Sequence, residues 1–218
     1  MVTRTQEERS TAMRRRLLDA TVECLVEYGY AGTTTPRVAE RAGVTRGAQV
    51  HHFPTKADLV TAAVRHLATE RVEFAAGETD RLKASADALG AGLDLLWGIH
   101  RGRLFVATVE LWMAARSDPE LRDQLKEVEP LVTGALAEFV RGQFPAQAAR
   151  PAFRHWLYTA MDVIRGILVS EVAMTDDRLD QRWRRARGHL LLLAAGLGLE
   201  GGSVSGHDQK LTDTTDKN

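Results

Sequence analysis

Apart from apolar residues that can form a buried core, the sequence has few features that would stabilise the protein or direct it to a membrane or out of the cell. Cys24 is its single cysteine, so no intramolecular disulfide can form, and a reducing compartment is expected. The longest apolar run begins at Leu190, is interrupted by two glycines, and reaches about half the length of a transmembrane helix. The charged N-terminal segment lacks the apolar stretch of a secretory signal. These absences predict a cytoplasmic protein that contacts no membrane.

Patterns typical of strands and of catalytic sites are also missing. No segment alternates apolar and polar residues between turn residues, so an all-α chain is expected. The sequence has no Gly-x-Ser-x-Gly elbow, phosphate-binding glycine loop or paired metal-ligand motif. The acidic pair Asp176-Asp177 stands at a helix start, where capping is its obvious role. We therefore expect no enzymatic activity, no cofactor and no metal.

The formal net charge is zero but is unevenly distributed. Residues 1–56 contain nine Lys or Arg against six Asp or Glu, a net charge of +3, which leaves −3 for the remainder. A basic end on an acidic body is expected of a protein that binds a polyanion locally. Differences of this size also occur on ordinary solvated faces.

Apolar residues recur at spacings of three and four along most of the chain, which predicts helices. The first helix ends at Gly29, the Thr33–Thr35 hydroxyls can cap the next at Pro36, and Thr55 caps a long one. The polar, glycine-rich tail 201–218 is expected to be disordered. After the first, the expected helices are 36–42, about 45–52, 56–76, 80–99, 102–117, 119–143, 147–174 and 177–199.

The segment VAERAGVTRGAQV, residues 38–50, joins two short helices through a glycine-containing turn, which is a helix-turn-helix pattern. The helices cross so closely that Ala39 must be small, and Gly43 can take the positive φ of a sharp turn. Packing of this pair against the first helix leaves the second helix little to bury. Its exposed side chains would suit a DNA major groove: Arg46, Gln49, His51 and His52.

The span from Leu17 to about Leu67 resembles the DNA-binding domain of the TetR family of transcriptional regulators. The matching stretches are EYGYAGTT, VAERAGVTRG and HHFPTKADLV, of which the aromatic residue before Pro-x-Lys is the most specific. The resemblance implies an N-terminal three-helix helix-turn-helix domain (1–56), then a six-helix ligand-binding and dimerisation domain (57–200) that shares the helix starting at residue 56. It also implies a homodimer that reads a palindromic operator in double-stranded DNA.

Twelve residues are assigned to DNA binding through this resemblance. Gln49 and Val50 depart from the family pattern of an apolar residue and then a tyrosine: either Gln49 is half buried and Val50 meets a thymine methyl, or the helix rotates and Gln49 pairs with adenine. Arg37 replaces the acid of a capping box, which frees it to reach phosphate. The set is Thr34, Thr35, Arg37, Thr45, Arg46, Gly47, Ala48, Gln49, Val50, His51, His52 and Lys56.

Large, adaptable side chains on consecutive later helices indicate a pocket for a small, largely apolar effector, although such stripes are more often plain core. The candidates are Trp97, His100, Phe105, Glu110, Trp112, Met113, Phe139, Trp156 and Met161. The helices at 147–174 and 177–199 are apolar on two sides, which predicts a four-helix dimer interface. Its candidates are Trp156, Ile164, Ile167, Leu168, Leu191 and Leu197.

The sequence therefore predicts a ligand-responsive repressor that an apolar effector releases from its operator. Two alternatives remain: a helical small-molecule carrier or enzyme that uses the body alone, and an architectural DNA binder without effector. His51, His52 and His66 could instead bind a metal, but adjacent helical residues point about 100° apart and no nearby cysteine or carboxylate completes the set.

Overall fold

The computed structural model describes residues 6–199, within which every regular element is helical, as expected. The predicted disorder of residues 201–218 lies outside the described residues. No helix among the described residues is both long and apolar enough to cross a membrane. The elements are α1 (Gln6–Gly32), α2 (Thr35–Ala42), α3 (Arg46–His52), α4 (Lys56–Gly77), α5 (Thr79–Ala84), α6 (Ala88–His100), α7 (Arg103–Ala114), α8 (Pro119–Gln143), α9 (Pro145–Ala148), α10 (Pro151–Leu168), the 3-10 turn η1 (Glu171–Ala173) and α11 (Asp176–Gly196).

Two of the expected helices and the expected number of helices are wrong in detail. The helix expected at 80–99 is two helices, because Asp87 caps a new start: its Oδ1 accepts a hydrogen bond from the Gly90 amide at 2.9 Å. The helix expected at 147–174 begins at Pro151 and ends at Leu168. The six helices expected for the body are therefore an undercount, since α5 and α9 are additional short elements.

The first helix is interrupted at Gly29, as expected, but helical residues follow, so that α1 kinks there and ends at Gly32. Gly29 has φ 64° and ψ −179°, a backbone region that is essentially closed to other residues. Its carbonyl accepts hydrogen bonds from the Thr33 amide (3.1 Å) and the Thr33 hydroxyl (2.8 Å). A Cβ at Gly29 would lie 2.7 Å from the carboxylate of Glu110 on α7, so that helix packs directly on the kink.

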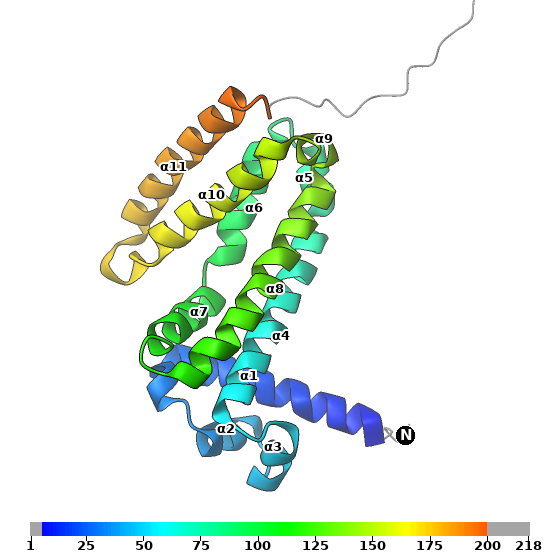
Figure 1. Cartoon of the computed structure of the whole chain (residues 1–218), viewed down its shortest axis with the longest axis vertical. Helices are drawn as coiled ribbons and strands as arrows, with labels where there is room; N and C mark the ends of the chain where they lie inside the picture. The colour runs from blue at the N-terminus through cyan, green and yellow to red at the C-terminus, as the bar shows by residue number, and fades with distance from the viewer. Residues whose placement is uncertain (1–5, 200–218) are drawn as a thin grey trace, which may run out of the picture.

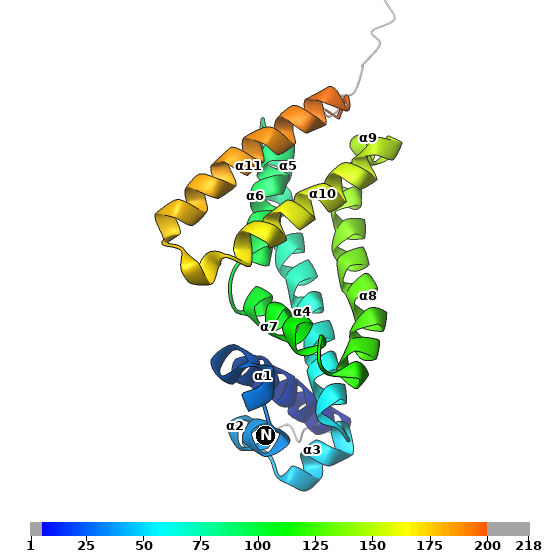
Figure 2. The same ribbon diagram turned by 60° about the vertical axis from the view of Figure 1, so that its left-hand side comes forward.

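Figure 1 shows a small bundle of α1, α2 and α3 at one end, from which α4 rises into the larger body with α8 beside it. α7 lies between this bundle and the helices α6, α10 and α11. α11 lies next to α10 at the outer edge in both views (Figure 2). The Thr61 hydroxyl of α4 donates to Gln124 of α8 at 2.5 Å. The bundle and the body are thus joined by one continuous helix.

Three buried clusters form the core. The N-terminal cluster, which includes Leu17, Cys24 and Phe53, holds α1 to α3 against the start of α4. The upper cluster joins α6, α8, α10 and α11. Between them, the middle cluster packs α1 on α4, α7 and α8; its members are Leu25, Val60, Val64, Ala107, Leu111, Ala115, Leu121, Leu125 and Val128. α4 contributes to all three clusters.

Cys24 lies fully buried in the N-terminal cluster. Burial raises the pKa of its thiol, because a thiolate would lose its hydration there. The side chain therefore behaves as a small apolar core residue.

Candidate nucleic-acid interface and ligand cavity

The α2–turn–α3 unit is fixed by local hydrogen bonds. The Thr34 side chain caps α2 by accepting from the Arg37 amide at 3.4 Å, and that of Thr45 caps α3 by accepting from the Ala48 amide at 3.2 Å. Gly43 between them adopts φ 63° and ψ 40°, the left-handed conformation expected of a C-cap. The predicted turn at Gly43 and the predicted hydroxyl cap of α2 are confirmed.

The register of α3 is set by Gln49, which is fully buried. Its side-chain amide donates to the Phe53 carbonyl at 2.7 Å and so closes the end of the helix. The assignment of Gln49 to DNA binding is therefore wrong in this conformation, because the side chain points into the N-terminal core. Val50, the next residue, is 46% exposed on the outer face.

The remaining residues of α3 present a mixed face to solvent. Arg46, Gly47 and His51 are exposed, whereas His52 is half buried. Burial, together with the neighbouring His51 and Arg14, lowers the pKa of His52, so this ring is mostly neutral at pH 7. The guanidinium of Arg14 on α1 lies 5.2 Å from the Phe53 ring, which brings the basic start of α1 beside α3.

Arg37 on α2 is not as free as its sequence position indicates. Its guanidinium donates to the Gly32 carbonyl and lies over the Tyr28 ring at 4.3 Å. Both partners belong to the end of α1. A phosphate contact by Arg37 stays a prediction, and it requires competition with these internal partners.

Lys56 also has an internal role that the sequence did not indicate. Its ammonium donates to the Tyr30 carbonyl at 2.6 Å and lies 3.8 Å from the centre of the Tyr30 ring. Burial lowers the pKa of Lys56. The Tyr30 hydroxyl in turn donates to Asp118, the cap of α8, at 3.1 Å. Burial and Asp118 raise the pKa of Tyr30 to about 12. Lys56 therefore links the ends of three helices.

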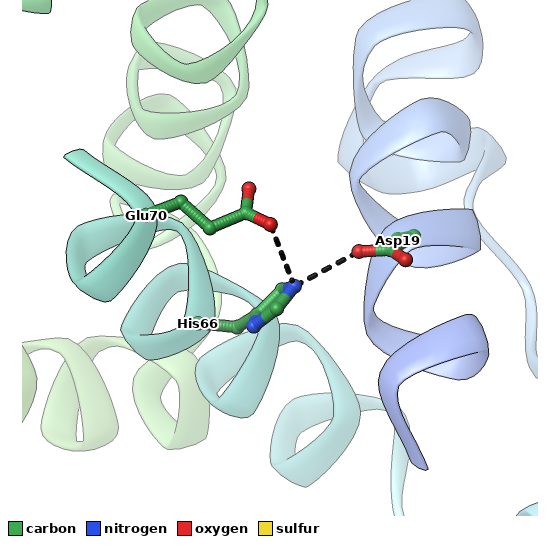
Figure 3. A group of neighbouring side chains, drawn as sticks. All are labelled: Asp19, His66 and Glu70. Carbon is green, nitrogen blue, oxygen red and sulfur yellow. Dashed lines mark hydrogen bonds and ion pairs between the residues drawn. The ribbon is translucent and has the colours of Figure 1, made fainter. Parts of the chain in front are cut away.

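Asp19 of α1 and His66 and Glu70 of α4 form a cluster across the two helices (Figure 3). His66 Nε2 lies 2.8 Å from Asp19 Oδ1 and 3.4 Å from Glu70 Oε1. The ligand-type atoms of the three side chains lie within 4.8 Å of one another. The structure thus gives His66 two carboxylate partners, and the group whose ligand atoms lie together contains neither His51 nor His52, with which the sequence had grouped it. The cluster fastens α4 to α1.

A cavity lies in the body between α4, α7 and α8, with residues of α6 and α10 at one side. It has about 530 Å³ of space between its atoms, including its opening. Three predicted ligand-binding residues line it: His100, Phe105 and Trp112. The full lining is Val64, Ala68, Arg71, His100, Phe105, Thr108, Leu111, Trp112, Leu125, Glu129, Val132, Thr133 and Arg165.

Four other residues predicted to bind ligand are away from this cavity, in or against the upper cluster: Trp97, Phe139, Trp156 and Met161. Trp97 stacks on Trp183 with ring centres 4.7 Å apart. Met161 is fully buried among core residues. The structure places them in packed core and not in this cavity wall, because the same apolar spacing describes both; their role in ligand binding stays a prediction.

Met113 and Glu110 are also absent from the lining. Met113 is exposed on the outer side of α7. The carboxylate of Glu110 faces Gly29 of α1, as described for the kink. Glu110 therefore meets the N-terminal bundle, and its predicted contact with a ligand stays a prediction.

The predicted dimer residues fall on both sides of their helices. Leu191 is half buried and Leu197 is exposed, so only α11 retains predicted residues at the surface. The other four form part of the monomer's own upper cluster, which contradicts their assignment: Trp156, Ile164, Ile167 and Leu168. Trp156, for instance, donates its indole N–H to the Leu190 carbonyl at 2.9 Å.

The polar groups of the cavity were largely missed. Arg165 donates to the Thr133 hydroxyl at 2.9 Å and lies 3.5 Å from Glu129, whose carboxylate accepts from Thr133 at 2.6 Å. Arg71 stands seven residues after Val64 on α4. Seven residues are about two helical turns, so Arg71 continues an apolar stripe on one side of α4. A charged residue within such a stripe is the one sequence signal that indicated an inward-facing cation.

Burial and Arg165 lower the pKa of Arg71 to about 9, so Arg71 remains a cation at pH 7. Burial and Arg71 lower the pKa of His100 to about 3. His100 is therefore neutral, and its Nδ1 donates to the Leu96 carbonyl at 2.8 Å. In that tautomer Nε2 is an acceptor.

Comparisons with known proteins agree with this architecture. Residues 17–63 match the family described as bacterial regulatory proteins, tetR family. An HTH-type transcriptional regulator of Mycobacterium bovis is 33% identical over 125 residues, which cover 57% of this chain and just under two thirds (64%) of that relative. The regulator CymR of Pseudomonas putida is 31% identical over 199 residues, which cover 88% of this chain and 93% of CymR.

The fold has solved counterparts as well. The multidrug binding protein EbrR, complexed with imidazole, superposes with a TM-score of 0.59 at 24% identity, over 83% of this chain and 93% of EbrR. This likeness supports the fold. Because the similarity to CymR spans nearly the whole of both chains, the protein belongs to the TetR family of DNA-binding transcriptional regulators.

Proposed function

We propose that the protein is a ligand-responsive repressor that binds a palindromic operator as a homodimer and is released by an effector in the cavity. The observation that carries this proposal is the path of α4. This helix starts four residues after α3 ends and lines the cavity with Val64, Ala68 and Arg71. The fold neighbour EbrR is described as a multidrug binding protein, which supports a small-molecule ligand for this arrangement.

The DNA contacts follow from the exposed side of the helix-turn-helix. Arg46, at the first position of α3, is the best placed to read a guanine, and Val50 can meet a thymine methyl. Thr35 lies at the start of α2, where amides and a hydroxyl suit phosphate. Gln49 is no longer part of this set, because it is buried.

The homodimer interface is proposed on the outer face of α11. Leu192, Leu193 and Leu197 are 72%, 44% and 38% exposed there, and Val169 at the end of α10 is 51% exposed. Gly188, four residues before Leu192, allows close approach. Exposed leucines in a row on one helix favour association. A second copy is the occupant that a palindromic operator requires, with recognition helices about 34–36 Å apart or a multiple.

The release mechanism uses the contacts between the cavity and the N-terminal bundle. Leu111 of α7 lines the cavity and also belongs to the middle cluster, where Leu25 of α1 packs. An effector that moves α7 or α4 would therefore turn the bundle. A coupling of 1–3 kcal/mol would change operator affinity roughly 5–150-fold.

Arg46→Ala is expected to weaken operator binding by about 1–3 kcal/mol and to relax preference at one base pair per half-site, because its guanidinium reads a base edge. Fluorescence anisotropy with DNA from upstream of its own gene, base-pair variants of that DNA and random DNA measures both effects. Arg116→Ala, at an exposed site beyond α7, is the matched control. An equal loss on operator and random DNA would make Arg46 a phosphate contact.

The same titrations separate the alternatives. Binding to the upstream DNA that resists competitor DNA would exclude a carrier that uses the body alone. Salt-sensitive binding of any DNA, without preference for the upstream sequence, would favour an architectural binder and contradict the proposed repressor.

Lys56→Ala is expected to lower both the stability of the protein and its affinity for DNA. Loss of the contact to Tyr30 should lower the free energy of unfolding by about 1 kcal/mol. Loss of a phosphate contact should weaken operator and random DNA about equally and reduce the salt slope by about one per contact. Thermal denaturation and salt titrations measure the two effects, with exposed Lys126→Ala as control. A lower melting temperature with an unchanged salt slope would leave Lys56 only its internal role.

A further inference from the structure

The charge of the cavity lining is unbalanced. It contains two cations, Arg71 and Arg165, and one carboxylate, Glu129. Glu129 lies 3.5 Å from Arg165 and shares the Thr133 hydroxyl with it, so it compensates that arginine. His100 adds no charge because it is neutral at pH 7. The lining therefore carries a net charge of +1, which is located at Arg71.

Arg71 has no counter-ion among the described residues. Its Nε and Nη2 are shielded from solvent and have no hydrogen-bond partner there. No described carboxylate lies within 4 Å of its guanidinium, and the neighbouring charge that acts on it is another cation, Arg165. Buried charges in proteins are normally paired, because an unpaired one loses its hydration without compensation. Two adjacent N–H groups of a guanidinium match the two oxygens of a carboxylate.

The rest of the lining is mostly apolar. The walls away from these polar groups include Val64 of α4, Leu111 of α7 and Leu125 of α8. All three also belong to the middle cluster that packs against α1. A ligand held at Arg71 would therefore extend its apolar part toward the N-terminal bundle.

We propose that the effector is a small, apolar monocarboxylate whose carboxylate pairs with Arg71 and whose apolar part lies along Val64, Leu111 and Leu125. This inference rests on the proposed function, since it names the ligand of the same cavity. It replaces the expectation of a largely apolar effector with an amphiphilic one that carries one negative charge. Binding supplies the counter-ion of Arg71 and fills the space beside the helices that contact the bundle.

The test compares ligands that share a scaffold and differ in charge. The full-length protein is titrated in a calorimeter with benzoate, benzamide and benzylamine, and with the second series hexanoate, hexanamide and hexylamine. We expect the carboxylate of at least one series to bind about tenfold or more tightly than its amide, as charge-assisted hydrogen bonds predict, and the amine to bind weakest. Equal binding of carboxylate and amide, tighter binding of the amine, or no carboxylate binding at millimolar concentration in either series would overturn the inference.

Variants of Arg71 assign the effect to this residue. Arg71→Met is expected to remove the preference for carboxylate over amide and to leave amide binding nearly unchanged. It should also fold, because it removes an unpaired buried charge and keeps the length of the side chain. Arg71→Lys keeps the charge without the paired N–H groups and should retain part of the preference. Arg116→Met is the control. A full preference in Arg71→Met would overturn the assignment.

Operator release distinguishes failure of this inference from failure of the proposed function. If a neutral or cationic compound releases the operator and carboxylates do not, the charge inference fails and the ligand-responsive repressor stands. If carboxylates bind through Arg71 and the operator stays bound, the ligand class stands and effector-driven release fails.

Discussion

Leu192→Glu is expected to give a folded monomer that no longer binds the operator specifically. Leu192 is 72% exposed on the outer face of α11, so a carboxylate there costs the monomer little but would be buried twice in a symmetric interface. Without the dimer, one recognition helix alone contacts DNA, and affinity should fall toward the non-specific level, on the order of 10³-fold or more. Sedimentation velocity, circular dichroism and anisotropy measure mass, folding and binding.

Leu131→Glu is the control, because Leu131 is 60% exposed on α8, away from α11. It should remain a dimer with full operator binding. If Leu192→Glu sediments as a dimer while Leu131→Glu dissociates, the interface lies on α8. Ile167→Glu would be a poor test of the interface: its side chain is in the upper cluster, so the charge would unfold the monomer.

Gly29→Ala is expected to destabilise the protein by about 1–3 kcal/mol, because φ 64° with ψ −179° is unfavourable for any residue that has a Cβ. The new methyl group would also lie 2.7 Å from the Glu110 carboxylate, which would have to move. The substitution should therefore loosen the packing of α7 on α1 as well as lower the melting temperature, by about 2–4 °C per kcal/mol for a chain of this size.

The double variant Gly29→Ala with Glu110→Ala separates the two causes. It relieves the contact but not the backbone strain, so we expect it to recover only part of the lost stability. Gly142→Ala is the control, since Gly142 is in α8 with nothing within 4 Å of its added Cβ; it should leave stability unchanged or raise it. Full stability in Gly29→Ala would show that the kink is not required.

The helix-turn-helix could be predicted from the sequence because its determinants are local. Caps at Thr34 and Thr45 and a left-handed Gly43 act within a few residues of their own positions. Gln49 shows the limit of this reasoning. Whether it faces DNA or the core depends on a contact with the Phe53 carbonyl and on the packing of α1, which the local pattern does not contain.

The sequence predicts that the body is helical, but it does not predict which face of each helix is buried. α10 and α11 carry apolar residues on more than one side, and periodicity does not say which side meets the monomer core, so Ile164 and Leu168 were assigned to an interface although both are buried in the upper cluster. The lining of the cavity was still harder to predict from the sequence. A cation such as Arg71 is normally assigned to solvent, and its inward position follows only from how α4, α7 and α8 are arranged.

Cys24 gives the protein a chemical reporter of its own. Since it is the single thiol of the chain and is fully buried in the N-terminal cluster, a thiol-reactive dye can label it only when that bundle opens. The labelling rate therefore reads the local opening equilibrium of the DNA-binding unit alone, without any engineered tag. The effect of bound DNA, of a bound effector or of a substitution on that unit can then be measured as a change in the labelling rate of Cys24.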